Sequence, residues 1–553
     1  MNLKTLESIC IAAMLCFPTL CKAEKVTSTH ENKKPEWLDF KAEYRVQSLF
    51  INPLDLNGTE VTDVHWTEQR LRLELSLKKP KVGRIYIQTD LLAGVLFGDN
   101  GSFGSDPEPT SGLAIASKQP NRAGWDVGLR DGADPLNPNS YVPVLHSLSP
   151  LAVKYLFGEV YLPFGVLRVG RQALTDGAAI SGHDGGRRNR WGVSRFNDIT
   201  DRILIATKLD EAIRLIRNQG NHKLDTSTKR GVILALTYDW NVQDEITSYD
   251  DDTYQTNVVL SWRKDKANWF GTQWRDFQLT GVLVHKGSNA FDTSIWATPL
   301  RFETHVGPSF INLQLSWIFG ETQEVSEGIS LLSAKTPKKQ ELRQYGAHLY
   351  ADYKLGPVTL GMEFDYASGD SDPRGHTPLT QFNFTRDFNV GLLLFEHLMA
   401  FQSARSAAVG IENLSKLNSP SFPLTEIASD GRFGNAIAIF PQLKVDLLTG
   451  PKHWLHARFG VLAAWPAAGV VDPVMTILNE DGEHIEDDAV NFHGGDPGSY
   501  YGTEFDLQLE WTVAKFFTWT LEAAYLIPGD ALEDMHGDAV PAYLIENRFV
   551  FEN

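Results

Sequence analysis

Apolar and polar residues alternate along most of the chain with a period of two. The clearest stretch is Arg70–Lys78, where four leucines occupy every second position and mostly charged residues stand between them. The same alternation recurs in Phe40–Gln47, Ile311–Phe319, Val358–Tyr366 and Thr503–Trp511. A period of two places alternate side chains on opposite faces of a β-strand. The pattern therefore predicts an all-β protein whose strands each have one apolar and one polar face.

The predicted strands are longer than those of a soluble β-sandwich. Many run to about 10 residues or more, whereas strands of globular proteins average roughly 5–6 residues. About 10 residues is the length that a tilted strand needs to cross a bilayer. Aromatic residues near strand ends, as in membrane-interface girdles, are Tyr44, Trp66, Trp240, Trp262, Trp317, Tyr353, Trp511 and Trp519. These features predict a transmembrane β-barrel.

The turns and loops fix the expected topology. The alternation gives about 18 strands, an even number as in bacterial barrels. Short turns such as Lys79–Lys81 and Pro163–Gly165 alternate with long polar connections. The long connections are residues 98–149, 175–198, 321–343, 368–432 and 466–500. We therefore predict an antiparallel barrel over residues 39–553, with short periplasmic turns and long extracellular loops.

The first 23 residues have the pattern of a secretory signal peptide. A short apolar run, Ile9–Phe17, is followed by small residues at Cys21 and Ala23, the two positions that a signal peptidase reads. Lipidation of Cys21 is the alternative, although Pro18 stands where a leucine is expected. Cleavage after Ala23, which we favour, leaves a periplasmic N-terminal segment over residues 24–38.

Composition narrows the range of functions. All three cysteines precede the expected cleavage site, so the mature chain has no disulfide scaffold, cysteine metal site or thiol nucleophile. The formal net charge of −18 at pH 7 argues against nucleic acid as a partner. His183 and Asp184 are adjacent, but no serine-bearing elbow accompanies them. We predict no enzymatic activity, no catalytic residue, no metal and no cofactor.

Two motifs carry a resemblance to a known family. Leu167–Gln172 ends in Gly-Arg-Gln and precedes a glycine-containing loop, Asn189 and an Arg/Asp-rich entry to the next strand. The second motif, Glu363–Asp370, ends in Ser-Gly-Asp. With these motifs the chain resembles the alginate-export family of outer-membrane barrels, which implies an outer-membrane location and polysaccharide export. Asn389–Phe401 and Leu526–Asp530 are similar instead to an uncharacterised outer-membrane family of deltaproteobacteria.

The polar strand faces supply the candidate lumen residues. Arg171 and Arg202 are expected at the outer rim, opposed by Asp198 and Asp201. They either brace the wall through bidentate pairs, which we favour for any single residue, or form a track for anions. The mixed signs of the lumen charges suit neutral or zwitterionic solutes as well. The residues expected along the solute path are Lys41, Arg45, Arg70, Arg72, Arg84, Arg171, Arg202, Glu363 and Asp365.

Three further segments bear on function. The densest basic patch of the outer loops is Arg187, Arg188, Arg190 and Trp191. It is either a solvated loop or a carbohydrate contact in which Trp191 stacks on a sugar ring. Asn389–Arg405 is predicted as a helix that either packs within its loop, which we favour, or folds into the lumen as a plug. Asp210–Asn218 is predicted as a short helix in a periplasmic connection.

Together these features predict a porin-like channel of the outer membrane that exports a polysaccharide or passes a polar solute. The alternative is a structural or adhesive barrel with a plugged lumen, whose loops bind a partner. Expected partners are outer-membrane lipid, the barrel-assembly machinery and a periplasmic polysaccharide-export complex. The assembly machinery is expected because the aromatic-rich terminal strand, Tyr543–Asn553, resembles an outer-membrane assembly signal.

Overall fold

The computed structural model describes residues 37–98, 149–403, 429–470 and 498–553, together with two short paired strands, β4 (Pro120–Asn121) and β5 (Gly124–Trp125). The gaps within these ranges are 55, 57, 59–61, 176, 186–188, 195–197, 219–224, 226, 241–252, 290, 324–338, 373–376, 387, 430 and 534–538. The expected signal peptide, almost all of the N-terminal segment and most of the loop 98–149 lie outside the described residues.

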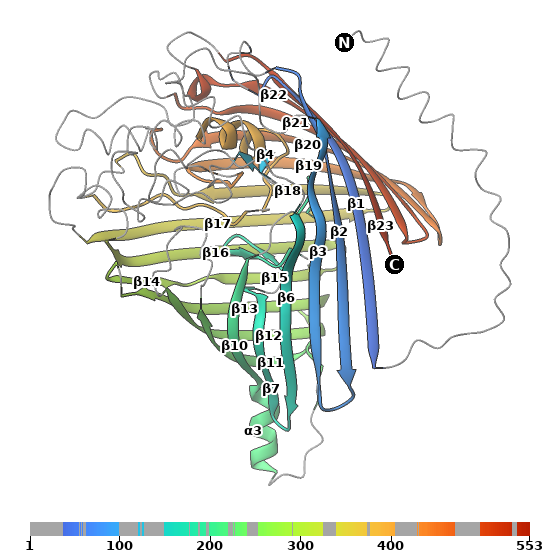
Figure 1. Ribbon diagram of the computed structural model, residues 1–553, viewed down its shortest axis with the longest axis vertical. Helices are drawn as coiled ribbons and strands as arrows, with labels where there is room; N and C mark the ends of the chain where they lie inside the picture. The colour runs from blue at the N-terminus through green and yellow to red at the C-terminus, as the bar shows by residue number, and fades with distance from the viewer. Residues whose placement is uncertain are drawn as a thin grey trace.

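A single antiparallel sheet forms the wall of the molecule (Figure 1). Its strands are β1 (Leu38–Asn52), β2 (Val64–Lys79), β3 (Gly83–Gly98), β6 (Ser149–Leu162), β7 (Gly165–Ala173), β10 (Ile199–Lys208), β11 (Gly231–Trp240), β12 (Tyr254–Trp269), β13 (Thr272–Ser288), β14 (Thr293–Ala297), β15 (Leu300–Val306), β16 (Ser309–Thr322), β17 (Gln340–Leu355), β18 (Val358–Ala367), β19 (Ala436–Thr449), β20 (His453–Pro466), β21 (Gly502–Val513), β22 (Phe517–Pro528) and β23 (Ala542–Glu552).

The sheet closes on itself because β1 pairs with both β2 and β23. Its 19 segments include β14 and β15, which both lie between β13 and β16 and are two parts of one wall strand. The break falls at Pro299, which has no backbone N–H to donate to the ladder. The barrel therefore has 18 wall strands, which confirms the predicted fold class and strand count.

The outward face of the wall is apolar. Leu236, Leu260 and Leu507 are each about half exposed, at 50–51%. Aromatic rings stack near the outer strand ends: the exposed Tyr238 stacks on the partly buried Tyr254, with ring centroids 6.2 Å apart. A closed barrel with this exterior satisfies every backbone group within the sheet and presents hydrocarbon to lipid. The chain is therefore a closed transmembrane β-barrel of the outer membrane.

One predicted girdle residue lies on the other face of the wall. Trp66 shares the lumen face of β2 with Arg70, is 5% exposed, and packs edge-on against His397 with ring centroids 6.3 Å apart. Its even position on β2 would have identified the lumen face, because the outward leucines of that strand are odd-numbered.

Apart from the long connection between β10 and β11 (residues 209–230), the connections are sorted by length between the two rims, as predicted. Tight turns join strands at one rim; in the β12–β13 turn, Phe270 and Gly271 both have positive φ (52° and 75°), typical of a type I′ hairpin. Long connections lie at the other rim. Within them are β8 (Ala178–Ala179), β9 (Gly182–His183), the π-helix η2 (Leu394–Met399) and the 3-10 helix η3 (Asp530–Leu532).

The short periplasmic helix is present as α3 (Leu209–Arg217), directly after β10, at the end of the barrel that carries the tight turns (Figure 1). Asp210 and Glu211 stand in its first turn and Arg214 and Arg217 in its last, which complements the helix dipole. Among the described residues, no helix is long and apolar enough to cross a membrane.

Candidate functional site

Residues 174–198, which join β7 to β10, fold into the barrel; we call them the inward loop. Arg45 and Arg70, on the lumen face of β1 and β2, both donate hydrogen bonds to the backbone oxygen of Ser194, with N···O distances of 3.0 and 3.4 Å. Arg72 donates to another backbone oxygen of this loop at 2.8 Å. Three lumen arginines therefore hold the loop against one side of the wall.

The same loop reaches the opposite wall. The backbone N–H of Ile180 donates to Oε1 of Gln314, on β16 and half-way round the barrel from β2, at 2.9 Å. The backbone N–H of Gly192 donates to Glu522, on β22 and two strands from β1, at 3.0 Å. Trp191 is 1% exposed and stacks on Phe440, on β19, with ring centroids 5.7 Å apart. The inward loop therefore spans the lumen.

Arg190 occupies the centre of a buried polar cluster. Its Nη2 lies 2.6 Å from Oε1 of Glu363, which is 1% exposed, and its guanidinium lies 3.9 Å from the ring centroid of Tyr350. Beside it, Nδ1 of His348 and Oδ1 of Asp365 are 2.6 Å apart, and both side chains are at most 1% exposed. The strand face predicted from Glu363 and Asp365 thus meets the basic loop inside the barrel.

His348, Glu363 and Asp365 form the single group in the described part of the chain that brings three potential metal-ligand atoms within 4.8 Å of one another. However, the two oxygens of Glu363 already accept hydrogen bonds from Arg190 at 2.6 Å and Gln442 at 2.7 Å. A guanidinium in contact with a ligand opposes a second cation. These contacts explain the cluster as a hydrogen-bonded charge network that fixes the inward loop.

Residues 382–403, between β18 and β19, also lie inside the barrel; we call them the plug segment. They contain the predicted helix, as the π-helix η2 continued by an α-helical turn to residue 403. Glu504 on β21 is fully buried and accepts the backbone N–H groups of Leu392 and Leu393 at Oε1 (2.6 and 2.9 Å) and of Leu394 at Oε2 (2.7 Å). The interpretation as a helix packed within its outer loop is therefore wrong, since the segment folds into the lumen.

The wall around the plug segment is apolar on its lumen face. Phe440, Leu462 and Leu526, from the outer halves of β19, β20 and β22, are 0% exposed, and they belong to one hydrophobic cluster with Leu393 and Phe395 of the plug. Burial of this apolar surface stabilises the segment inside the barrel. One sector of the outer lumen is therefore filled by protein.

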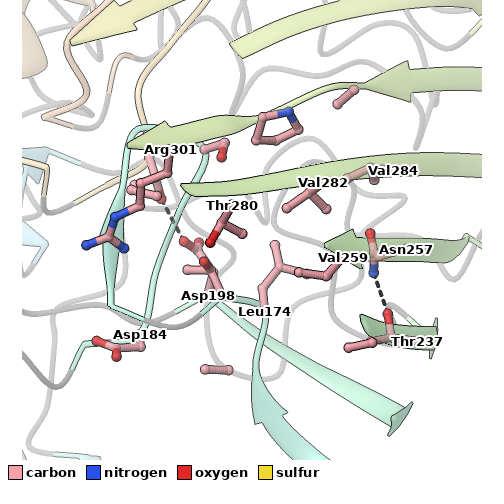
Figure 2. A pocket seen from close by; sticks show the side chains of 18 of the residues that line it. Leu174, Asp184, Asp198, Thr237, Asn257, Val259, Thr280, Val282, Val284 and Arg301 are labelled. Carbon is pink, nitrogen blue, oxygen red and sulfur yellow. Dashed lines mark hydrogen bonds between the residues drawn. The ribbon is translucent and has the colours of Figure 1, made fainter. Parts of the chain in front are cut away.

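The rest of the lumen holds a cavity of about 920 Å³, bordered by the inward loop, the plug segment and the wall from β10 to β16, with contributions from β2 to β7. Figure 2 shows Val259, Val282 and Val284 bordering it, next to the hydrogen bond from Asn257 Nδ2 to Thr237 Oγ1, which is 2.6 Å long. Its charged lining residues are Glu74, Arg168, Asp184, Asp198, Arg202, Arg263, Lys286, Arg301, Arg386 and Arg432. Cations thus outnumber acids, although both signs face the cavity.

A second cavity of about 290 Å³ lies nearer the rim with the tight turns. Arg190, Tyr350, Lys444 and Arg458 line it together with Asp352. Since the inward loop contributes Arg190 here and further residues to the larger cavity, this loop borders both spaces.

Eight of the nine residues predicted along the solute path face the lumen, mostly in ion pairs. Arg72 pairs with Asp90 at 2.7 Å, and Arg202 pairs with Asp239 at 2.6 Å. Asp198 was expected opposite Arg202, but it instead accepts a hydrogen bond from Thr385 of the plug segment at 2.7 Å. Other residues predicted along the path pair as Lys41–Glu74, Arg70–Glu43, Arg84–Glu159 and Arg190–Glu363.

Arg171 does not face the lumen. In the strand register it lies opposite Leu156 and Asp201, and Leu156 is an outward side chain, 49% exposed. Directly opposed residues of an antiparallel pair share a face. Arg171 therefore pairs with Asp201, at 3.0 Å, on the outside of the wall near the outer rim.

The basic loop patch also differs from its prediction. Arg187 and Arg188 lie outside the described residues. Arg190 and Trp191 lie within the lumen rather than in a solvated outer loop, because the inward loop folds back between the walls. At 1% exposure, Trp191 presents no ring surface to a sugar.

Two functional features escaped the sequence reasoning. Glu504 stands at an ordinary polar position of an alternating strand, so no local signal marks it as the anchor of the plug segment. The apolar lumen wall did leave a signal: Val232–Leu236, Val258–Leu260 and Val282–Val284 are continuous apolar runs, in which residues of both faces are apolar.

Asp370 follows β18 in the acidic stretch of the second motif. Its carboxylate accepts the backbone N–H groups of Asp372 at 2.9 Å and Thr380 at 3.0 Å. Burial raises the pKa of Asp370 above its usual range. This side chain therefore shapes the loop that leads into the plug segment.

Comparison with known proteins gives no family. No family model matches the sequence, and no curated protein matches it either. Similar solved structures include OccAB1 of Acinetobacter baumannii (8% identity, TM-score 0.47, 94% of this chain and 97% of that one) and OccK11 (OpdR) of Pseudomonas aeruginosa (9%, 0.45, 93% and 96%). The outer membrane protein OprD of Pseudomonas aeruginosa is similar at 9% identity and a TM-score of 0.44, over 93% of both chains. The resemblance to alginate exporters has no support from a family match.

Proposed function

We propose that the protein is a channel through which small polar solutes cross the outer membrane. The observation that carries this proposal is the cavity of about 920 Å³ inside a closed barrel, lined by hydrogen-bonding and charged groups of both signs. A cavity of this size matches small organic molecules. The inward loop borders both this space and the smaller one nearer the tight turns, so it stands along the route between them.

Export of a polysaccharide suits this geometry less well. The inward loop spans the lumen, and the plug segment fills one sector of its outer half. Buried arginines of the wall donate hydrogen bonds to the inward loop, and the plug segment donates backbone hydrogen bonds to Glu504. A linked sugar chain would require these bonds to break, whereas a single small solute would not.

The charges predict a preference for anions. Seven cationic and three acidic side chains line the larger cavity. At least three of the arginines are paired with carboxylates, which reduces the field, and the majority of cations among the lining side chains favours anions. In a potassium chloride gradient we expect the reversal potential to shift toward that of chloride.

Planar-bilayer recording and liposome swelling test the channel directly. Purified protein should give stepwise ion currents, and swelling in solutes of rising mass should slow steeply at the size that the cavity admits. Protein-free liposomes and liposomes with heat-unfolded protein are the controls. The proposal fails if the folded protein gives neither current nor swelling.

A second candidate function is a barrel whose lumen is permanently closed. The burial of residues 390–403 of the plug segment favours it, since all of them are buried and Leu393 and Phe401 are 0% exposed. The two candidates differ in their currents: a closed barrel conducts only after the plug segment has been loosened.

A further inference from the structure

An apolar row crosses the lumen face of β10 to β13. Ala206 pairs with Ala235, Ala235 with Val259, and Val259 with Val282, so these four side chains stand side by side on four successive strands. All four border the larger cavity. The backbone N–H of Val282 donates to the oxygen of Pro299 at 2.9 Å, which continues the row onto the next wall strand.

Hydrogen-bonding side chains flank the middle of this apolar row on both sides. Toward the outer rim, Thr237 and Asn257 are register partners and are hydrogen-bonded to each other. Toward the periplasm, Ser261 and Thr280 hydrogen-bond at 2.8 Å, and Arg301 lies opposite Thr280 on the next strand. On β12 the apolar band is therefore one side chain wide, between Asn257 and Ser261. On the neighbouring strands Leu204, Ile233 and Val284 widen it.

Packing against other segments accounts for the apolar lumen positions around the plug but not for this row. Phe440 and Leu462 are 0% exposed, because Trp191 of the inward loop stacks on Phe440 and Gly391 of the plug segment lies against Leu462. Val259 and Val282 are only half-buried and face the cavity. When an apolar group contacts an exposed apolar surface, both surfaces are removed from water, and this burial stabilises the contact.

We propose that this row is the contact site for the apolar body of the transported solute. The cavity then takes small organic molecules that carry a hydrocarbon portion together with a polar or charged end. This inference rests on the proposed channel function and narrows its solute class. The ends of such a molecule can meet the Thr237–Asn257 pair, Arg301 or Asp198, all of which line the same cavity.

A chain-length series measures the contact. Straight-chain alkanoates from butanoate to octanoate are added to single channels, and the concentration that half-blocks the ion current is recorded; the matching alkylammonium ions form a second series. Complete burial of one methylene corresponds to about a fourfold gain in affinity. We expect the blocking concentration to fall by roughly two- to fourfold per methylene in at least one series.

Variants locate the effect. The double variant V259T/V282T replaces two methyl groups of the row with hydroxyls at nearly constant shape, and should flatten the chain-length dependence. T280V widens the apolar band and should steepen it. V258T is the matched control, because Val258 is the neighbouring residue on the same strand and faces lipid at 44% exposure. Heat-dependent mobility in detergent gels establishes that each variant is folded.

Equal slopes in the wild type, V259T/V282T and V258T would overturn the contact site while leaving the channel intact. A binding measurement separates failure of the channel from failure of the contact site. Equilibrium dialysis of labelled hexanoate against the protein in lipid nanodiscs reports binding without any current. Binding that V259T/V282T weakens, in a protein that conducts nothing, would keep the site and refute the channel. No binding and no chain-length effect would refute the site.

Discussion

Substitution of Glu504 by glutamine tests whether one carboxylate holds the plug segment in the lumen. The side chain is fully buried, and its two oxygens accept three backbone N–H groups at the start of the helical turn, over 2.6–2.9 Å. The approach is close: a Cβ on Gly391 would lie 2.9 Å from Oε1 of Glu504. Glutamine has nearly the same shape but only one oxygen and no charge.

The magnitude follows from what glutamine can still accept. Its oxygen can keep the bonds from Leu392 and Leu393, but its amide group would then face the N–H of Leu394, donor to donor. An unpaired buried N–H costs ~1–3 kcal/mol, and hydrogen bonds to a charged acceptor are worth ~1.5–3 kcal/mol against ~1 kcal/mol for a neutral one. We therefore expect E504Q to destabilise the seated plug segment by ~2–4 kcal/mol, which increases the population of its released form by roughly 30- to 1,000-fold.

Hydrogen exchange followed by mass spectrometry measures this release in peptides that cover residues 389–403. Exchange should quicken in E504Q, and bilayer recordings should show more frequent or larger openings. E510Q is the control, since Glu510 lies on the same face of the same strand and contacts Thr520 and His456 of the wall rather than the plug. Exchange in E504Q as slow as in E510Q and in the wild type would refute the reasoning, whatever the currents show.

Three further predictions concern charged groups. R190Q removes the guanidinium that pairs with the buried Glu363. The reversal potential in a potassium chloride gradient should therefore move toward that of potassium. An unchanged potential would contradict a place for Arg190 on the solute route. R202M strands the carboxylate of Asp239, which is 0% exposed, and should cost about 3–5 kcal/mol of stability. R171M breaks a pair whose side chains are 31% and 35% exposed, and should cost about 0–1 kcal/mol. The temperature at which each variant unfolds in detergent gels ranks the two, and equal decreases would count against the assigned burial. Asp225, outside the membrane, has its pKa lowered by the hydrogen bond from Arg230 and then by those from Ser227 and Lys208. Its contribution should be complete above its unfolded pKa and be lost as pH falls through the lower folded value, so D225N should speed amide exchange near residues 225–231 at pH 7 and make no difference in strong acid.

The barrel was predictable because each strand repeats the same two-residue rule. A wall that faces lipid on one side and water on the other requires the alternation seen in Arg70–Lys78, and the turn spacing then sets the count. The same rule could have placed Arg171 correctly. It shares its parity with Leu167 and Val169, the apolar face of its strand, whereas Arg168 has the opposite parity and lines the cavity.

The direction in which a loop folds has no such rule. The inward loop is polar and glycine-rich, a composition equally suited to the outer surface. Its place depends on partners far away in sequence: Arg45 lies 149 residues from Ser194, and Gly192 lies 330 residues from Glu522. Local pattern carries no information about such pairs, so the basic patch around Arg190 was assigned to the outside.

This difference changes how the lumen charges should be counted. Arg45, Arg70 and Arg72 are conspicuous along the strands, yet the structure engages them with loop carbonyls and neighbouring carboxylates. A solute in the cavity meets instead the groups that remain at its border, on β10 to β16 and on the two segments that fold inward. The strand cations therefore show how the inward loop is held in place. The solute preference must instead be derived from the side chains that border the cavity, where an apolar row runs across four strands between hydrogen-bonding groups.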